Sequence, residues 1–245
     1  MYMHRRCEMK KLHAVALVLG IVLLAGCVTP PSLHTPRPAA PGEVQLGAHG
    51  NVLFPPRLLG DDTTSLGEGQ FTGAPTFTAR YGVVENLEVG LNIGSIGAFG
   101  SLKYGLLPAT SPLQLSVLGG YGRWGFVFLP SALLEDEMEP LNYPSFDVGA
   151  LIGYELDQLV GVYGGVRHYW IGNAQAPFGR FQTTNVIVGA ELFPQRTFSF
   201  PVEMNFGFID ALEVIEEVLG TSVDDPGVET VIVWPSLNFG VTVSF

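Results

Sequence analysis

Hydrophobic and polar residues alternate one by one along most of the chain after residue 42. The clearest run is 86–94, where four aliphatic residues at odd positions alternate with Glu88, two glycines and Asn92. A period of two is typical of a β-strand with one apolar and one polar face. Ten runs of this kind predict ten strands, over 43–54, 75–82, 86–94, 98–106, 113–123, 145–156, 160–170, 182–193, 198–208 and 231–245.

The connections between these strands sort by length. If the N- and C-terminal ends of the barrel lie on the same side of the membrane, the short connections lie on that side too. They are near 83–85, 107–112, 157–159 and 194–197. The other side receives 55–74, 95–97, 124–144, 171–181 and 209–230, of which four are long. Short periplasmic turns and long outer loops are typical of bacterial outer-membrane barrels. The pattern therefore predicts an all-β fold, an antiparallel up-and-down transmembrane barrel of about ten strands, with eight to twelve possible.

Aromatic residues on the apolar face gather at the two ends of the expected strands. One end carries Tyr81, Tyr104, Tyr154, Phe198, Phe200 and Phe245, and the other carries Phe54, Tyr121, Phe146, Trp170 and Phe208. Aliphatic residues lie mostly between them. Two aromatic girdles around an aliphatic band match the two interfaces of a bilayer.

The N-terminus has the pattern of a bacterial lipoprotein signal. Basic residues precede an apolar run over 12–25, which is too short to span a bilayer as a helix. The run ends in Leu24-Ala25-Gly26-Cys27, which resembles the lipobox of bacterial lipoproteins. That resemblance implies cleavage before Cys27 and acylation of its thiol. Translation starting at Met9 would leave the same signal.

The expected organisation is a signal peptide over 1–26, a lipidated, proline-rich tether over 27–42, and a barrel over 43–245. Five prolines in 28–42, without any hydrophobic period, predict an extended, semi-rigid tether. Val28 stands where an aspartate would indicate inner-membrane retention, so the lipoprotein resemblance favours sorting to the outer membrane.

The amino-acid composition argues against some classes of partner. Hydrophobic residues make up 47% and charged residues 14% of the chain. Removing residues 1–26 leaves 8 basic and 22 acidic residues, a formal charge of −14, which argues against nucleic acid as a partner. Of the two cysteines, Cys7 lies in the signal, so the mature chain is expected to have no internal disulfide.

The last eight residues carry a second resemblance. Asn238, Gly240, Val243 and the final aromatic Phe245 fit, position by position, the C-terminal β-signal of bacterial outer-membrane barrel proteins. In that family the signal is read by the barrel-assembly machinery. The resemblance covers the expected barrel, 43–245, and implies an outer-membrane barrel of a Gram-negative-type bacterium with its long loops facing outside.

Charged residues of the polar face predict a network inside the barrel. It comprises Glu88, Asp147, Glu155, Glu191, Glu203, Arg80, Lys103 and Arg167, and we also assign Glu43 and Arg123 to this face. Buried charges must be paired or hydrated, so the lumen is either a plug of ion pairs or a narrow passage that prefers cations. Ten strands leave little space beyond side chains. Five large inward residues favour a filled lumen: Phe99, Leu118, Tyr163, Tyr169 and Trp234.

No motif for nucleotides, zinc or covalent catalysis is present, so we expect no cofactor, no metal and no enzymatic activity. His168 falls on the apolar register near one interface, which favours an interfacial role over catalysis. In the last long loop, 210–219 has apolar residues at helical spacing and predicts a short amphipathic helix. The acidic outer loops are expected to be solvated, or bridged by divalent cations to lipopolysaccharide.

The leading hypothesis is a non-enzymatic envelope protein, anchored by lipid at Cys27, with a packed polar lumen. Its expected partners are the bilayer, lipopolysaccharide, the lipoprotein-processing and sorting machinery, and the barrel-assembly machinery. Three alternatives stay open at this point. They are a narrow small-solute channel, an enzyme acting at the barrel rim, and a soluble periplasmic β-fold held by lipid alone.

Overall fold

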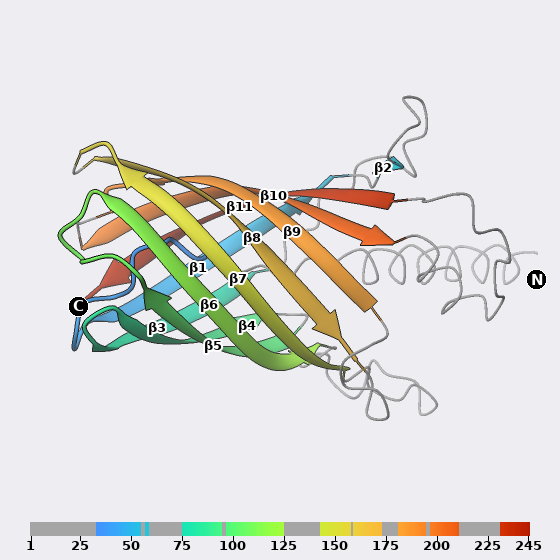
Figure 1. Ribbon diagram of the computed structural model, residues 1–245, viewed down its shortest axis with the longest axis horizontal. Helices are drawn as coiled ribbons and strands as arrows, with labels where there is room; N and C mark the ends of the chain where they lie inside the picture. Colours follow the sequence, from blue (N-terminus) through green and yellow to red (C-terminus); the bar gives the residue numbers. More distant parts are fainter. Residues whose placement is uncertain are drawn as a thin grey trace, which may run out of the picture.

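Ten long antiparallel strands follow one another around a closed barrel (Figure 1). The computed structural model describes residues 33–54, 57–58, 75–94, 97–124, 143–157, 159–172, 181–194, 197–210 and 231–245. Its strands are β1 (Val44–Leu53), β2 (Arg57–Leu58), β3 (Thr76–Val84), β4 (Leu87–Gly94), β5 (Gly97–Gly105), β6 (Leu113–Trp124), β7 (Tyr143–Glu155), β8 (Val160–Ile171), β9 (Phe181–Leu192), β10 (Phe198–Asp210) and β11 (Val231–Ser244). The predicted ten-stranded up-and-down barrel is confirmed, and each predicted strand end lies within two residues of the observed one.

The barrel closes because β1 pairs with both β3 and β11. At the seam, the Val44 and Phe245 main chains exchange two hydrogen bonds, 3.2 and 2.9 Å long between N and O. The two-residue strand β2 adds to β11 beside Ile232 and Val233. A closed sheet leaves no row of unpaired N–H and C=O groups at an edge, which is a requirement for a sheet surrounded by lipid.

The two ends of the barrel differ in their connections. We call the end with the four connections β3–β4, β5–β6, β7–β8 and β9–β10 the turn end, and the opposite end the loop end. The C-terminal residue lies at the turn end (Figure 1). At the turn end, the two-residue turn Glu85–Asn86 joins paired residues Val84 and Leu87, and Asn86 has a φ of 64°. Asparagine tolerates this left-handed conformation, which two-residue hairpin turns require.

The outer surface of the barrel is apolar. Aliphatic residues such as Leu91, Ile152 and Val188 are 45–58% exposed, because the alternation of each strand directs them outward. Exposed aromatic residues lie near both ends, with Tyr81, Tyr104, Tyr154, Phe198 and Phe245 at the turn end and Phe54, Phe77 and Tyr121 at the loop end. An aliphatic band between two aromatic rows is the outer surface of a membrane-spanning barrel.

One sequence expectation about the strands is wrong. Arg123 does not face the lumen: its side chain is exposed and shares the outward register of Tyr121 in β6. It lies one residue from the loop end of that strand, next to Ala98 of β5, so its charge is beyond the aliphatic band. The predicted helix at 210–219 lies outside the described residues, apart from Asp210, which ends β10. No helix long and apolar enough to cross a membrane occurs in the described ranges.

Candidate functional site

The lumen holds a segment of the chain itself. Residues 33–40, here called the lumen segment, precede β1 and lie inside the barrel. Leu33, His34 and Ala39 are each 2% exposed although they belong to no strand. The sequence predicts an extended, proline-rich tether here, and it gives no indication that the tether enters the barrel. The lumen is therefore filled by main chain as well as by wall side chains.

A tight turn at the turn end reverses the chain between the lumen segment and β1. The Glu43 N–H donates to the Ala40 carbonyl over 2.9 Å, with Pro41 and Gly42 between them. Gly42 has a φ of 80°, which glycine adopts readily, and proline is favoured at the preceding position of a type II turn. The Gly42 N–H also donates to Gly82 of β3 over 2.8 Å. The lumen segment thus runs antiparallel to β1.

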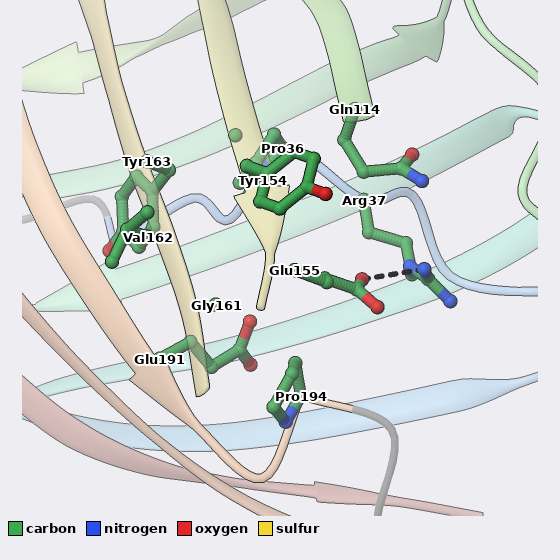
Figure 2. A pocket seen from close by; sticks show the side chains of 11 residues that line it. Pro36, Arg37, Gln114, Tyr154, Glu155, Gly161, Val162, Tyr163, Glu191 and Pro194 are labelled. Atoms are coloured by element: carbon green, nitrogen blue, oxygen red, sulfur yellow. Dashed lines mark ion pairs between the residues drawn. The ribbon is translucent and has the colours of Figure 1, made fainter. Parts of the chain in front are cut away.

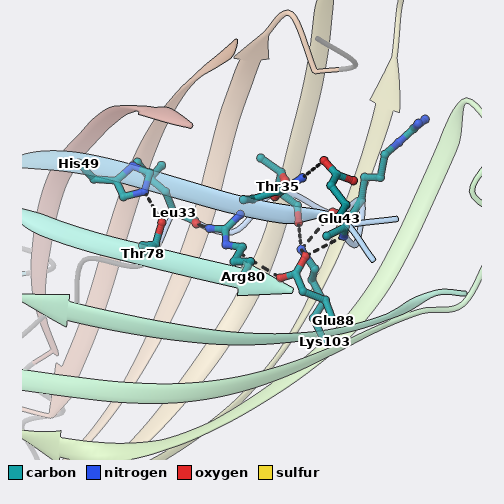
Figure 3. A network of polar contacts seen from close by, with 11 residues as sticks. Leu33, Thr35, Glu43, His49, Thr78, Arg80, Glu88 and Lys103 are labelled. Atoms are coloured by element: carbon teal, nitrogen blue, oxygen red, sulfur yellow. Dashed lines mark hydrogen bonds and ion pairs between the residues drawn. The ribbon is translucent and has the colours of Figure 1, made fainter. Parts of the chain in front are cut away.

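One acidic side chain of the wall holds the lumen segment by its main chain. Glu88 of β4 accepts a hydrogen bond from the Ala39 N–H over 2.8 Å. The same carboxylate pairs with Lys103 of β5 over 3.0 Å and lies 3.9 Å from Arg80 of β3 (Figure 3). All three charged side chains are no more than 4% exposed. Oε2 of Glu88 thus accepts from the Ala39 N–H and lies against the Lys103 ammonium, while Oε1 faces Arg80 without a hydrogen bond.

The two cations in turn donate to carbonyls of the lumen segment. Lys103 Nζ donates to the Thr35 and Arg37 carbonyls over 3.1 and 3.0 Å. Arg80 Nη2 donates to the Leu33 carbonyl (Figure 3). An ammonium has three donors, so Lys103 uses all three on Glu88 and the segment. Wall side chains therefore hydrogen bond to the main chain of the lumen segment at four of its eight residues.

A second ion pair joins the segment's own charge to the wall. Arg37 Nη2 lies 2.6 Å from Glu155 Oε1 at the end of β7 (Figure 2). The Glu155 side chain is 10% exposed and that of Arg37 is 28% exposed. The pair borders a small cavity of about 20 Å³, which Glu191 and Tyr163 also line (Figure 2). Arg37 is the single lysine or arginine between Cys27 and β1, and it meets an acid of the wall.

Wall glycines leave room for the prolines of the segment. A Cβ at Gly105 of β5 would lie 3.0 Å from Cγ of Pro38. A Cβ at Gly153 of β7 would overlap Pro36, and one at Gly82 would overlap the Ala40 carbonyl. These three glycines face the lumen near the turn end, each within the last three residues of its strand. Their lack of side chains lets the segment pack directly against the wall backbone.

The remaining lumen charges pair with wall groups. Arg167 of β8 donates to Asp147 of β7 over 2.8 Å and lies 5.0 Å from the ring centroid of Tyr169. Glu203 of β10 accepts hydrogen bonds from Tyr163 and Asn238, both 3.4 Å long. Ser199 is the hydrogen-bonding partner of Glu191. All eight charged residues expected to form a lumen network therefore face the lumen, and they form several local clusters.

Apolar side chains fill the space between these clusters. Leu118, Leu151, Tyr163 and Ile187 form one buried group on β6 to β9. Phe99 and Ile171 form a second group, against which Tyr143 packs. Of the five residues predicted to point inward, Phe99, Leu118, Tyr163 and Tyr169 are buried. The fifth, Trp234, is half-buried on the inward register of β11. The prediction misses Leu151 and Ile187, although both lie on the inward register of their strands.

The turn end contains the larger cavity, of about 420 Å³. The lumen segment forms part of its wall, together with Glu43, Glu85, Glu191 and Phe245. Partial burial would raise the pKa of Glu43, but hydrogen bonds from Gln45 and the Ala40 N–H outweigh it and lower that pKa. Glu43 is thus held as a carboxylate at the mouth, next to the turn that begins the segment.

The other predicted site residues have different positions. Asn238 of the predicted assembly signal is buried against Glu203, and Gly240 faces the His49 ring. Val243 and Phe245 of that signal face outward at the turn end. His168 hydrogen bonds Thr184 over 2.8 Å and contacts Trp170, 4.3 Å between ring centroids, on the outer surface. The lipobox, Leu24 to Cys27, lies outside the described residues.

Within the described part of the chain, no group of three or more histidine, cysteine, aspartate or glutamate residues is placed to hold a metal ion. The chain matches no family model and no curated protein. The N-terminal β-barrel domain of Pseudomonas aeruginosa OprF resembles it with 11% identity over 84% of this chain and 100% of that one, at a TM-score of 0.37.

Two further solved structures are similar at the same low level. Neisserial surface protein A (NspA) is 18% identical over 83% of this chain and 96% of its own, with a TM-score of 0.34. The outer membrane protease OmpT from Escherichia coli is 8% identical over 83% and 94%, with a TM-score of 0.41. These values say nothing about what the present chain does, so its function has to be argued from its own residues.

Proposed function

We propose that this protein is an outer-membrane barrel of the bacterial envelope, anchored by acyl chains on Cys27, with a non-enzymatic role and a lumen closed by its own N-terminal segment. The aliphatic band between two aromatic rows supports placement in a bilayer. The apparent lipobox before Cys27 supports the anchor, and two or three acyl chains suffice for stable attachment. The long, acidic loops face outside in this proposal, towards lipopolysaccharide.

The observation that carries the closed lumen is the burial of Leu33 to Ala39 among the wall charges. Glu88, Lys103 and Arg80 together make four hydrogen bonds to main-chain groups of this segment. Buried charges that lost these partners would each remain uncompensated, which is costly in a low-dielectric interior. The closed arrangement is thus favoured over a barrel with the segment outside.

Ion conductance across a planar bilayer tests the proposal. We compare the lipidated, full-length mature protein with a variant that lacks residues 33–40 and retains Cys27. The parent is expected to show no conductance steps. The deletion variant is expected to conduct and to prefer cations, because five lumen acids then face three lumen bases. A matched variant that lacks eight residues of an outer loop, 133–140, is expected to stay closed.

Heat-modifiable migration on a gel shows that each variant is folded before its conductance is compared. A folded deletion variant that fails to conduct would show that wall side chains, not the segment, close the barrel. Conductance of the parent equal to that of the deletion variant would instead favour a narrow small-solute channel. That second function has one observation in its favour, the cavity of about 420 Å³ at the turn end.

A further inference from the structure

The outer face of the barrel carries a basic side chain that has no counterpart in the lumen clusters. Four of the lysine and arginine side chains that the structure describes form ion pairs with carboxylates inside the barrel: Arg37, Arg80, Lys103 and Arg167. Arg123 is instead exposed on the outer face of β6, one residue from the loop end of that strand. Its guanidinium is therefore placed to meet a partner outside the chain.

Three aromatic side chains lie beside Arg123 on adjacent strands. Tyr121 of β6 is two residues before Arg123 on the same face and is 59% exposed. Tyr121 pairs with Phe146 of β7, and Phe146 pairs with Trp170 of β8, so the three form a row across strands that lie side by side (Figure 1). Because neighbouring strands are about 4.8 Å apart, this aromatic row extends over about 10 Å of the outer face.

The far end of the aromatic row is fixed by its neighbours. The Trp170 ring lies 5.5 Å from the Phe146 ring between centroids, and the His168 ring contacts its other side edge-on. His168 is itself held by its hydrogen bond to Thr184 of β9. Aromatic rings that are already fixed lose little conformational freedom when a ligand stacks on them, so more of the contact energy remains for binding.

The outer surface beside Tyr121 carries no large side chain on one flank. Ala98 of β5 pairs with Arg123, and Gly100 pairs with Tyr121. Gly119 precedes Tyr121 by two residues on the same face of β6. An added Cβ would meet only a carbonyl oxygen, at 3.8 Å for Gly100 and 3.5 Å for Gly119. Both positions are open towards lipid, so a hydrocarbon chain can lie there against the main chain.

We propose that the surface formed by Arg123 and the aromatic row of Tyr121, Phe146 and Trp170 binds the phosphorylated sugar headgroup of an outer-leaflet glycolipid, the lipid portion of lipopolysaccharide. The inference rests on the proposed function, which places the loop end outside. Arg123 donates to a phosphate, the aromatic row stacks against sugar rings, and an acyl chain covers the open surface beside Tyr121.

The depth of Arg123 in the bilayer favours a phosphate as its partner. A strand rises about 3.3 Å per residue and tilts by about 40°, so Arg123 lies about 5 Å further from the membrane centre than Tyr121. Aromatic belts lie at the level of the headgroups, and basic side chains close to them attract anionic lipids. The planar guanidinium can bind a phosphate through two parallel N–H donors. A phospholipid would occupy the arginine and leave the aromatic row without a sugar partner.

Lipid binding to the purified, full-length mature protein in detergent micelles tests the inference. Native mass spectrometry measures the affinity for lipid A carrying two phosphates, and for phosphatidylglycerol as the competing phospholipid. Arg123→Gln is expected to lower the lipid A affinity about fivefold or more, and Tyr121→Ala about threefold. Phe77→Ala is the matched control, because Phe77 is 61% exposed at the loop end of β3, outside the aromatic row, and its loss is expected to leave the affinity unchanged.

Three results would overturn the inference: no binding of lipid A to the parent, an unchanged affinity in Arg123→Gln, or an equal loss in Tyr121→Ala and Phe77→Ala. Phosphatidylglycerol bound as tightly as lipid A, and weakened equally by Arg123→Gln, would also overturn it, because the surface would then recognise any anionic lipid. Heat-modifiable migration shows that each variant is folded. The assay reads the outer face alone, so conductance of the parent would refute the closed lumen of the proposed function without changing this result.

Discussion

The ion pair between Arg37 and Glu155 gives the most direct test of how strongly the barrel wall binds the lumen segment. We expect Arg37→Ala to destabilise the closed barrel, because it removes an ion-pair partner of Glu155, whose side chain is 10% exposed. Fully exposed pairs contribute about 0.2–1 kcal/mol, and breaking a fully buried pair costs about 3–5 kcal/mol. Arg37 is 28% exposed, so solvent screens the pair in part and we expect a coupling of about 1–2 kcal/mol.

A double-mutant cycle isolates this coupling from other effects of the substitutions. The parent, Arg37→Ala, Glu155→Gln and the double variant are unfolded in urea, and the folded fraction is read from heat-modifiable migration. Each single variant is expected to have a lower urea midpoint, and the double variant is expected to lose less than the sum of the two. A coupling below about 0.3 kcal/mol, the usual error of additivity, would refute the reasoning. The segment would then be held by its main-chain contacts without help from Arg37.

Two further outcomes follow from the contacts of the lumen segment. Gly153→Ala is expected to lower the urea midpoint by the equivalent of about 1–3 kcal/mol, the usual range for an overpacked site. Gly100→Ala is the matched control, because Gly100 is on the outer face and its added Cβ would make only an ordinary contact, 3.8 Å from the Tyr121 carbonyl oxygen; an equal loss in both variants would contradict the packing of Pro36 against Gly153. Because the pKa of Glu43 is lowered below its ordinary value of 4.5, its contribution to stability is present above that pH and is lost as the pH falls through the lowered pKa. The urea midpoint of the parent should therefore fall more steeply below pH 4.5 than that of Glu43→Gln, and parallel curves would show that Glu43 contributes nothing.

The strands could be predicted because a barrel in lipid repeats one rule at every position. Alternation predicts that Leu91 and Ile152 face lipid and that Glu88 faces the lumen. In the closed sheet Leu91 and Ile152 are exposed and Glu88 is buried, as predicted. The same rule predicts that Arg123 faces outward, because it is two residues after Tyr121 and lies on the same face of β6. Parity also places Leu151 and Ile187 inside, against the usual preference of aliphatic residues for lipid in such a barrel.

The lumen segment could not be predicted from periodicity, because its contacts are made by main chain. Its side chains show no period of two or of 3.6, and three of its eight residues are proline or arginine. One local signal was present: Pro41-Gly42 directly before the first strand is typical of a type II turn that reverses the chain. A reversed segment can lie along either the lumen face or the lipid face of β1. The lumen face can be chosen only when it is known that Gly105 and Gly153 lie beside the prolines of the segment.

The way Lys103 and Arg80 hold the segment has a consequence for how this protein can evolve. Their hydrogen bonds end on carbonyl groups, which every amino acid carries, so most side chains of the segment are free to drift. Selection should act mainly on the wall cations, on Glu88 and on the glycines that face the segment. Homologues would then be recognised by a pattern of small and charged residues spaced across separate strands, while the segment that fills the lumen shares almost no sequence between them.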